Sequence, residues 1–196
     1  MRFTRKSEVI RRYEERIHTP TILGESYSKS AASTFLKDRA QEFDFSKRYD
    51  VFLSHSFTDA RIVRQVRKRL INEGLTVYVD WIEDKQLNRS NVGAYTALLL
   101  RHRMDQCNSL IYLTSDAAEK SVWMPWELGY MDSSTKKVAI APIVDDDEAD
   151  FPSREYLGIY PYIEIAESYM FTRQMDGKFK SVDAWTKNTY DWIDSS

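Results

Sequence analysis

From residue 49 onward, short apolar runs alternate with longer segments that have helical periodicity. The run YDVFLSHS, residues 49–56, is bounded by polar residues as a buried strand is, and the segment after it repeats apolar residues at three- and four-residue steps. The same patterns predict strands at residues 75–80, 109–115, 137–144 and 162–165 and helices at residues 58–74, 91–106 and 181–196. Because each parallel strand needs a crossover connection, this alternation predicts an α/β fold built on a mainly parallel sheet.

These elements fit a flavodoxin-like, doubly wound sheet of five strands in the order 2-1-3-4-5. Residues 1–46 fall outside the alternation and hold two helical patterns separated by Pro20 and Gly24. They predict an N-terminal helical extension, which either takes part in assembly or regulation or covers a sheet edge. The domain with the sheet is predicted to span residues 47–196 and to end in a C-terminal helix capped by Ser181.

Composition argues against several classes of partner. The chain has 196 residues, with 28 basic and 30 acidic ones and a formal charge of −2, so a polyanion is not expected as the main partner. A single cysteine, Cys107, permits no internal disulfide. The N-terminus lacks the apolar core of a signal peptide, and no run approaches the roughly eighteen apolar residues of a membrane span. We therefore expect a soluble, cytoplasmic protein with no nucleic-acid and no membrane partner.

The segment KSVWMPWELGYMD, residues 120–132, combines two tryptophans, a proline and a glutamate at a predicted helix start. Proline is tolerated only in the first turn, so the helix should begin near Ser121 or Val122, with Glu127 within two turns of that point. Trp123 and Glu127 are four residues apart and share a face, and an indole beside a carboxylate suits a cationic ring attached to a sugar. The alternative is that the tryptophans belong to the core and the helix dipole favours the glutamate.

Other polar residues have open interpretations. His55, at the exit of the first strand, either contacts a substrate or bonds to the backbone, and Asp80 either reaches a ribose or begins a turn. The acidic run at residues 145–148 is typical of a solvated loop, so no metal site is expected there. A phosphoacceptor receiver domain shares this fold class but needs an aspartate where this chain has Thr114 and Ser115, so that function is not expected.

Four segments together resemble bacterial TIR (Toll/interleukin-1 receptor) domains. The resemblance covers residues 47–165 and is closest to the standalone TIR proteins of anti-phage systems such as Thoeris. The segments that carry it are YDVFLSHSFTDA, VYVDWIEDKQLNRSNV, SLIYLTS and WMPWELGYMD. The family implies a flavodoxin-like fold, in agreement with the periodicity.

The resemblance also implies functional residues. In enzymatic members of the family, a glutamate on the helix after the third strand is needed to cleave the nicotinamide–ribose bond of NAD+, with a tryptophan four residues earlier near the substrate. That pattern makes Glu127 the predicted catalytic residue, with NAD+ as substrate and neither a cofactor nor a metal. The candidates for substrate binding are Trp123, Ser54, His55, Ser56, Phe57, Asp80 and Trp126.

Residues 81–90, WIEDKQLNRS, occupy the position of the family's BB loop, which contributes to self-association and gates the cleft. The segment lacks the Arg-Asp-x-x-Pro-Gly of animal receptors, and the C-terminal Phe-Trp box is not recognisable, so adaptor signalling of the receptor type is not expected.

The preferred hypothesis is an NAD+ nucleohydrolase or ADP-ribosyl cyclase that produces a nucleotide signal in bacterial anti-phage defence. Its expected partners are NAD+, other TIR surfaces through self-association, and a downstream effector that senses the product. One alternative is a TIR module that binds a protein or a nucleotide without turnover. Another is a nucleoside glycosyl transferase of related fold.

Overall fold

The computed structural model describes residues 46–84, 94–115, 117–143, 154–165 and 169–194. The chain divides into two compact units, residues 1–41 and 42–196, and every described residue belongs to the second. The predicted N-terminal helical extension, apart from Ser46, lies outside the described residues.

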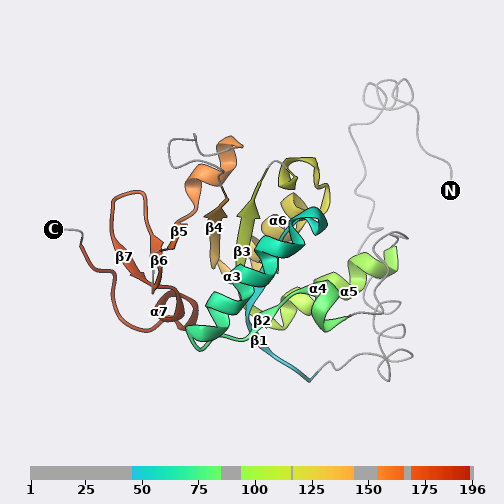
Figure 1. Ribbon diagram of the computed structural model, residues 1–196, viewed down its shortest axis with the longest axis horizontal. Helices are drawn as coiled ribbons and strands as arrows, with labels where there is room; N and C mark the ends of the chain where they lie inside the picture. Colours follow the sequence, from blue (N-terminus) through green and yellow to red (C-terminus); the bar gives the residue numbers. More distant parts are fainter. Residues whose placement is uncertain (1–45, 85–93, 116, 144–153, 166–168, 195–196) are drawn as a thin grey trace, which may run out of the picture. The chain divides into compact units, whose positions relative to one another are not determined.

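A seven-stranded sheet forms the centre of the second unit, with the strand order β2-β1-β3-β4-β5-β6-β7 (Figure 1). The strands are β1 (Tyr49–Ser54), β2 (Val77–Tyr78), β3 (Cys107–Thr114), β4 (Val138–Pro142), β5 (Tyr162–Ile165), β6 (Met170–Arg173) and β7 (Phe179–Ser181). Strands β1 to β5 pair in parallel, which confirms the predicted mainly parallel α/β sheet and its order 2-1-3-4-5.

The strands β6 and β7 extend the sheet beyond the five that the sequence analysis predicts. They pair antiparallel, first β5 with β6 and then β6 with β7. The turn between them is closed by the amide of Gln174, which donates to the carbonyl of Lys178 at 2.7 Å, and it contains Gly177 at a φ of 88°. Asp176-Gly177 is a common hairpin signal, because such a turn needs positive φ. That signal was missed, and the prediction of five strands is corrected to seven.

Helices cover both faces of the sheet. They are α3 (Ala60–Asn72), α4 (Asp80–Glu83), α5 (Ala94–Asp105), α6 (Trp123–Thr135) and α7 (Val182–Lys187), with the 3-10 turns η1 (Phe57–Asp59), η2 (Ala118–Lys120) and η3 (Glu155–Ile159). Buried residues of α3 and α7 form one core cluster, and those of α5 and α6 form the other. Along β3, Ile111 and Leu113 belong to the first cluster and Leu110 and Tyr112 to the second, as the two-residue period of a strand requires.

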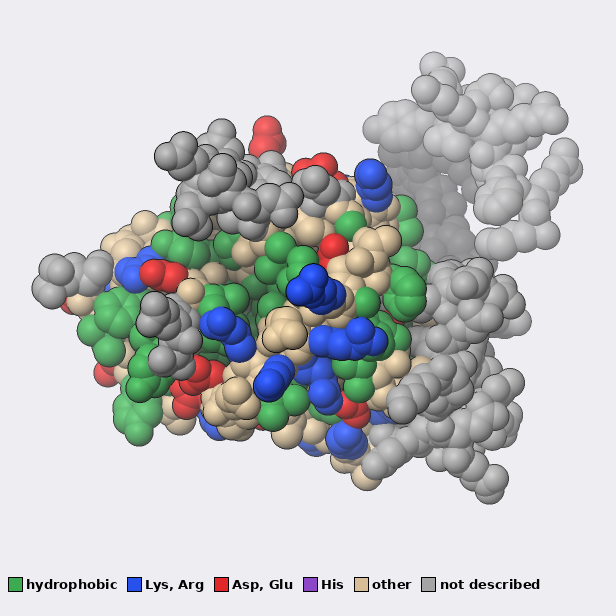
Figure 2. All heavy atoms as spheres, in the orientation of Figure 1, with side chains coloured by type: hydrophobic (Ala, Val, Ile, Leu, Met, Phe, Trp, Pro, Cys, Tyr) green, Lys and Arg blue, Asp and Glu red, His purple; other side chains and the backbone are tan. Residues whose placement is uncertain are grey.

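Helix α3 has an apolar inner face and a basic outer face. Val63, Val66 and Leu70 are buried against the sheet at three- and four-residue steps. The arginines and the lysine of α3 are not balanced by any acidic residue within the helix, and basic side chains gather over it in Figure 2. Past the end of the helix, Gly74 adopts a φ of 79°, which only glycine adopts without strain, so the predicted stop at this residue is confirmed.

The C-terminal helix is shorter than predicted. Helix α7 ends at Lys187, because Asn188 adopts left-handed backbone angles and reverses the chain. The returning segment then pairs with β7, where Phe179 and Ile193 exchange backbone hydrogen bonds of 3.0 and 2.9 Å. Ser181 occupies the predicted capping position, but its side chain makes no capping hydrogen bond. Of the predicted helical face, residues 182–193, only the part up to Lys187 is helical.

Candidate active site

The carboxyl ends of β1 and β3 meet at a pocket, as expected for the point where strand order reverses. The pocket has a volume of about 500 Å³, within the range of small-molecule sites. Residues 55–58 line it after β1, and Ala117, Lys120 and Ser121 line it after β3. The two segments are joined where the Ser115 hydroxyl donates to the Asp59 carboxylate at 2.6 Å. The predicted candidates His55, Ser56 and Phe57 are therefore brought together in one pocket lining.

Helix α6 places Glu127 beside β1. The helix begins at Trp123, next to the predicted start, and Ser121 Oγ accepts the backbone N–H groups of Trp123 and Met124 at 3.3 and 3.2 Å. The side chain of Glu127 is 1% exposed and its Oε2 accepts a hydrogen bond of 2.7 Å from the Ser54 hydroxyl. Ser54 directly precedes His55 of the pocket lining, so Glu127 lies behind the pocket wall and is not among its lining residues.

His55 is held by hydrogen bonds to both ring nitrogens. Its Nδ1 lies 2.8 Å from the carbonyl of Leu53, and its Nε2 lies 2.8 Å from the indole nitrogen of Trp81. An indole N–H only donates and a carbonyl only accepts, so Nε2 accepts and Nδ1 carries the hydrogen. This arrangement is the neutral imidazole. The backbone interpretation of His55 is confirmed. The ring also lines the pocket, and contact with a substrate stays a prediction.

Asp80 begins α4, as the structural interpretation expects, and is 2% exposed. Its Oδ1 lies 3.6 Å from His55 Nε2, so it lies against the histidine and behind the pocket. Neither Asp80 nor Glu127 lines the pocket in this arrangement.

The two tryptophans of α6 form an aromatic row with Tyr130. The rings of Trp123 and Trp126 lie 5.5 Å apart and nearly perpendicular, and those of Trp126 and Tyr130 lie 6.1 Å apart. Trp123 is partly buried and packs against the core cluster of α5 and α6, whereas Trp126 is 37% exposed. Neither ring lines the pocket. Trp123 thus has core contacts, which the alternative interpretation expected, while part of its surface remains accessible.

Tyr112 of β3 lies close enough to Glu127 for the carboxylate to affect its pKa. Burial raises the pKa of Tyr112 to about 12, and the neighbouring Tyr156 and Glu127 act in the same direction. The hydroxyl therefore stays protonated at neutral pH.

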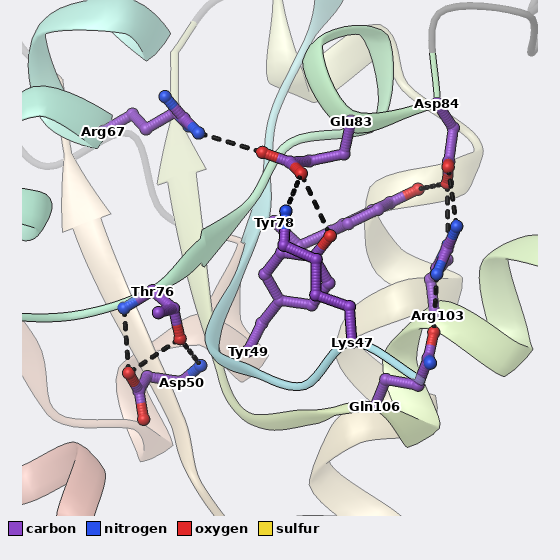
Figure 3. Close-up of polar contacts among 10 residues, drawn as sticks. All are labelled: Lys47, Tyr49, Asp50, Arg67, Thr76, Tyr78, Glu83, Asp84, Arg103 and Gln106. Carbon is purple, nitrogen blue, oxygen red and sulfur yellow. Dashed lines mark hydrogen bonds and ion pairs between the residues drawn. The ribbon is translucent and has the colours of Figure 1, made fainter. Parts of the chain in front are cut away.

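Two acidic residues fix the segment that leads from β2 into the predicted BB loop (Figure 3). Asp84 accepts hydrogen bonds of 2.8 and 2.7 Å from Nε and Nη2 of Arg103 and a further one of 2.8 Å from the Tyr78 hydroxyl. Asp84 and Arg103 are both 2% exposed. Next to this pair, the Cys107 thiol donates to the Arg103 carbonyl at 3.1 Å. Burial raises the pKa of Tyr78 well above its usual value, and the Asp84 carboxylate adds to this effect.

Glu83 makes the second set of contacts. It accepts hydrogen bonds from Lys47 Nζ at 2.6 Å, from the Tyr49 hydroxyl at 3.0 Å and from Arg67 Nη2 at 2.9 Å (Figure 3). Burial acts to raise the pKa of Glu83, but the hydrogen bonds from Lys47 and Tyr49 outweigh it, so the pKa is lowered. The prediction of a loop without helical structure at residues 81–90 is corrected, since residues 81–83 belong to α4 and residues 85–90 lie outside the described residues.

The pairing of Asp84 with Arg103 was not predicted. The available signal was the helical period, which puts Arg103 four residues after Leu99 on the buried side of α5. A charged residue at such a position needs a buried partner.

Within the described ranges, no group of three or more His, Cys, Asp or Glu side chains is arranged to hold a metal ion. The acidic run at residues 145–148 lies outside those ranges. Among the helices of the described residues, none has the length and apolar character needed to cross a membrane.

Comparison with known proteins gives a family match over most of the second unit. A family model described as TIR domain matches residues 51–176. A curated relative from Bacillus cereus (strain MSX-D12), named "Probable 3' cyclic ADP-D-ribose synthase ThsB'", is 48% identical over 134 residues, which are 68% of this chain and 69% of the relative.

Two further matches are more distant. A protein of Cytobacillus dafuensis, named "Putative cyclic ADP-D-ribose synthase TIR2", is 30% identical over 105 residues, which are 53% of this chain and 28% of that protein. The crystal structure of the TIR domain of the Toll-related receptor TRR-2 from Hydra magnipapillata aligns with a TM-score of 0.44 and 16% identity, covering 58% of this chain and 82% of that chain.

Proposed function

This chain is a member of the TIR domain family, and from that premise we propose that it cleaves the bond between nicotinamide and ribose in NAD+. Two relatives named as cyclic ADP-D-ribose synthases support this reaction, one of them at 48% identity. The finer proposal is that the ADP-ribosyl group is released as a cyclic nucleotide, with linear ADP-ribose from hydrolysis as the competing product.

The buried contact between Glu127 and Ser54 is the observation that carries the proposal. The Ser54 hydroxyl donates to Oε2 at 2.7 Å and orients the carboxylate beside the pocket end of β1. Cleavage of the nicotinamide–ribose bond leaves positive charge at the anomeric carbon and releases neutral nicotinamide. A negative charge in a site with little water stabilises that positive charge more strongly than water does. Glu127 is thus the proposed catalytic residue and Ser54 its positioning residue.

Access to Glu127 requires a movement. At 1% exposure the carboxylate does not reach a ribose in the described arrangement, so substrate entry must displace residues of the pocket wall around His55. Trp123, whose ring is partly exposed four residues before Glu127, is the proposed contact for nicotinamide. After nicotinamide departs, a nucleophilic atom of the same ADP-ribosyl group closes the ring, or water adds and loses a proton.

Nicotinamide release tests the reaction. Purified protein of residues 1–196 incubated with NAD+ is expected to release nicotinamide. Glu127→Gln, which keeps the size of the side chain and removes its charge, is expected to lower the rate by about a hundredfold or more. Chromatography of the product distinguishes a cyclic nucleotide from ADP-ribose. An unchanged rate in Glu127→Gln would refute the assigned role.

Binding without turnover is the second candidate function. The observation that favours it is the absence of Glu127 from the lining of the described pocket. A protein that binds NAD+ measurably and releases no nicotinamide, even when concentrated to promote self-association, would have this function. A nucleoside glycosyl transferase would instead act on nucleosides and leave NAD+ intact.

We further propose that the product acts as a signal in Thoeris-type anti-phage defence, with self-association through TIR surfaces and a downstream effector that senses the nucleotide. The supporting observation is the relative named ThsB'. Growth of phage-infected cells expressing this protein with a matching effector, compared with cells expressing Glu127→Gln, tests this role. Equal protection by both would contradict it.

A further inference from the structure

The pocket at the ends of β1 and β3 presents hydroxyl hydrogens to a ligand. Ser121 Oγ accepts two backbone N–H groups at 3.3 and 3.2 Å, so its acceptor positions are used and its own hydrogen remains for donation. The hydroxyls of Ser56 and Thr58 lie 3.0 Å apart, and this contact uses one of their two hydrogens. The remaining hydrogen is available to an acceptor in the pocket.

Among the described residues that line this pocket, Lys120 carries a positive charge. It is exposed and forms no ion pair within the part of the chain that the structure describes. His55, the other titratable residue in the lining, is held neutral by its two hydrogen bonds. The acidic residues adjacent to lining residues along the chain are Asp59, which accepts the Ser115 hydroxyl, Glu119, and Asp116, which lies outside the described residues. Neither Asp59 nor Glu119 lines the pocket.

We propose that this pocket is a subsite for the diphosphate of NAD+, with Lys120 as the charged contact and the hydroxyls of Ser56, Thr58 and Ser121 as donors. Diphosphate oxygens are strong acceptors with negative charge, and a lysine binds them as a point charge. The inference rests on the proposed function and adds to it the residue that recognises the part of the substrate remote from the bond that breaks.

Comparing KM for two substrates distinguishes a diphosphate subsite from a general effect of Lys120 on catalysis. Nicotinamide riboside has the same scissile bond as NAD+ but lacks the diphosphate. Lys120→Met is expected to raise KM for NAD+ by about tenfold, since one charge-assisted contact is lost, and to leave KM for nicotinamide riboside unchanged. Lys120→Arg, which keeps the charge, is expected to restore most of the loss. Lys68→Met removes an equal charge from the outer face of α3 and should change neither value by more than about twofold.

Salt gives an independent readout. KM for NAD+ is expected to rise with NaCl concentration in the unmodified protein and to rise less in Lys120→Met, because the screened contact is absent. Equal changes in KM for the two substrates, or an effect of Lys68→Met as large as that of Lys120→Met, would overturn the subsite.

Binding measurements separate a failure of the subsite from a failure of the proposed function. In the Glu127→Gln protein, ADP is expected to bind more tightly than adenosine, and Lys120→Met is expected to abolish that difference. If ADP and adenosine bind as expected while the unmodified protein releases no nicotinamide, the proposed reaction is refuted and the proposed diphosphate subsite is supported. If Glu127→Gln abolishes nicotinamide release while Lys120→Met leaves ADP binding unchanged, the proposed subsite is refuted and the proposed reaction is supported.

Discussion

Replacing Asp84 by asparagine tests the importance of the buried ion pair that precedes the predicted BB loop. The carboxylate accepts two hydrogen bonds from Arg103 and one from the Tyr78 hydroxyl, at 2.7 to 2.8 Å. An amide of the same shape keeps one acceptor oxygen and loses the charge. Arg103 then remains 2% exposed and keeps its Gln106 contact, but it loses the negative charge of Asp84.

Removing one partner of a buried ion pair destabilises a protein by about 3 to 5 kcal/mol, because the other charge is left in a medium of low dielectric constant. We expect Asp84→Asn to lower the free energy of unfolding by about 3 kcal/mol, the lower end of that range, since the amide oxygen still accepts one hydrogen bond. The exposed Asp176, whose carboxylate lies 3.4 Å from Lys178 Nζ, provides the control, and Asp176→Asn should cost less than about 1 kcal/mol.

Urea unfolding monitored by tryptophan fluorescence measures the difference. All 5 tryptophans lie between Trp81 and Trp192, so the signal reports on the second unit of the chain. A double variant, Asp84→Leu with Arg103→Met, removes both charges and should recover most of the loss, since an apolar pair can replace a buried ion pair. A loss in Asp84→Asn below about 1 kcal/mol, or a double variant worse than the single one, would refute the reasoning.

Three further predictions concern single residues. Trp81→Phe removes the indole donor at 2.8 Å from His55 Nε2, while the Leu53 carbonyl still holds the hydrogen on Nδ1, so the ¹⁵N NMR signal of Nε2 should shift and that of Nδ1–H should persist; an unchanged Nε2 signal would contradict this role. Gly74→Ala, at a φ of 79° with no atom within 4 Å of the added carbon, should cost roughly 1 kcal/mol in urea unfolding. Gly158→Ala, which also meets open space but lacks positive φ, should cost less, and equal costs would argue against a backbone origin. Glu83→Gln should destabilise the protein at pH 7, and the difference should shrink as the pH falls below 4.5. The hydrogen bonds lower the pKa of Glu83 in the folded state, so their stabilisation is present above the unfolded pKa and lost on protonation; a constant difference between pH 7 and 3 would contradict the assignment.

The parallel part of the sheet was predictable because its strands are buried on both faces and carry uninterrupted apolar runs such as Val51 to Leu53. The start of α6 was predictable for a local reason, since Pro125 restricts where that helix can begin. The end of α7 was not predicted, because Trp192 and Ile193 continue a helical period although the chain has already reversed at Asn188. Trp192 is partly buried against the core cluster of α3 and α7, and Ile193 is exposed and pairs with Phe179 in a β-bridge, a contact that periodicity does not contain.

The site was only partly predictable. Glu127 and the exit of β1 were identified as neighbours from the topology, because parallel strands place their carboxyl ends on one edge. The individual bond from Ser54 to Glu127 joins residues 73 positions apart and depends on side-chain packing, which local patterns do not encode. The same is true of Trp81, whose contact with His55 joins residues 26 positions apart.

The thiol of Cys107 has a practical consequence. Cys107 is the single cysteine of the chain and is 5% exposed at the start of β3. Burial raises the pKa of its thiol far above the usual value. Thiolate, the form that reacts with alkylating agents, is therefore scarce while the protein is folded. The rate at which iodoacetamide labels this chain accordingly measures how often the start of β3 becomes exposed, with no engineered probe and at any ligand concentration.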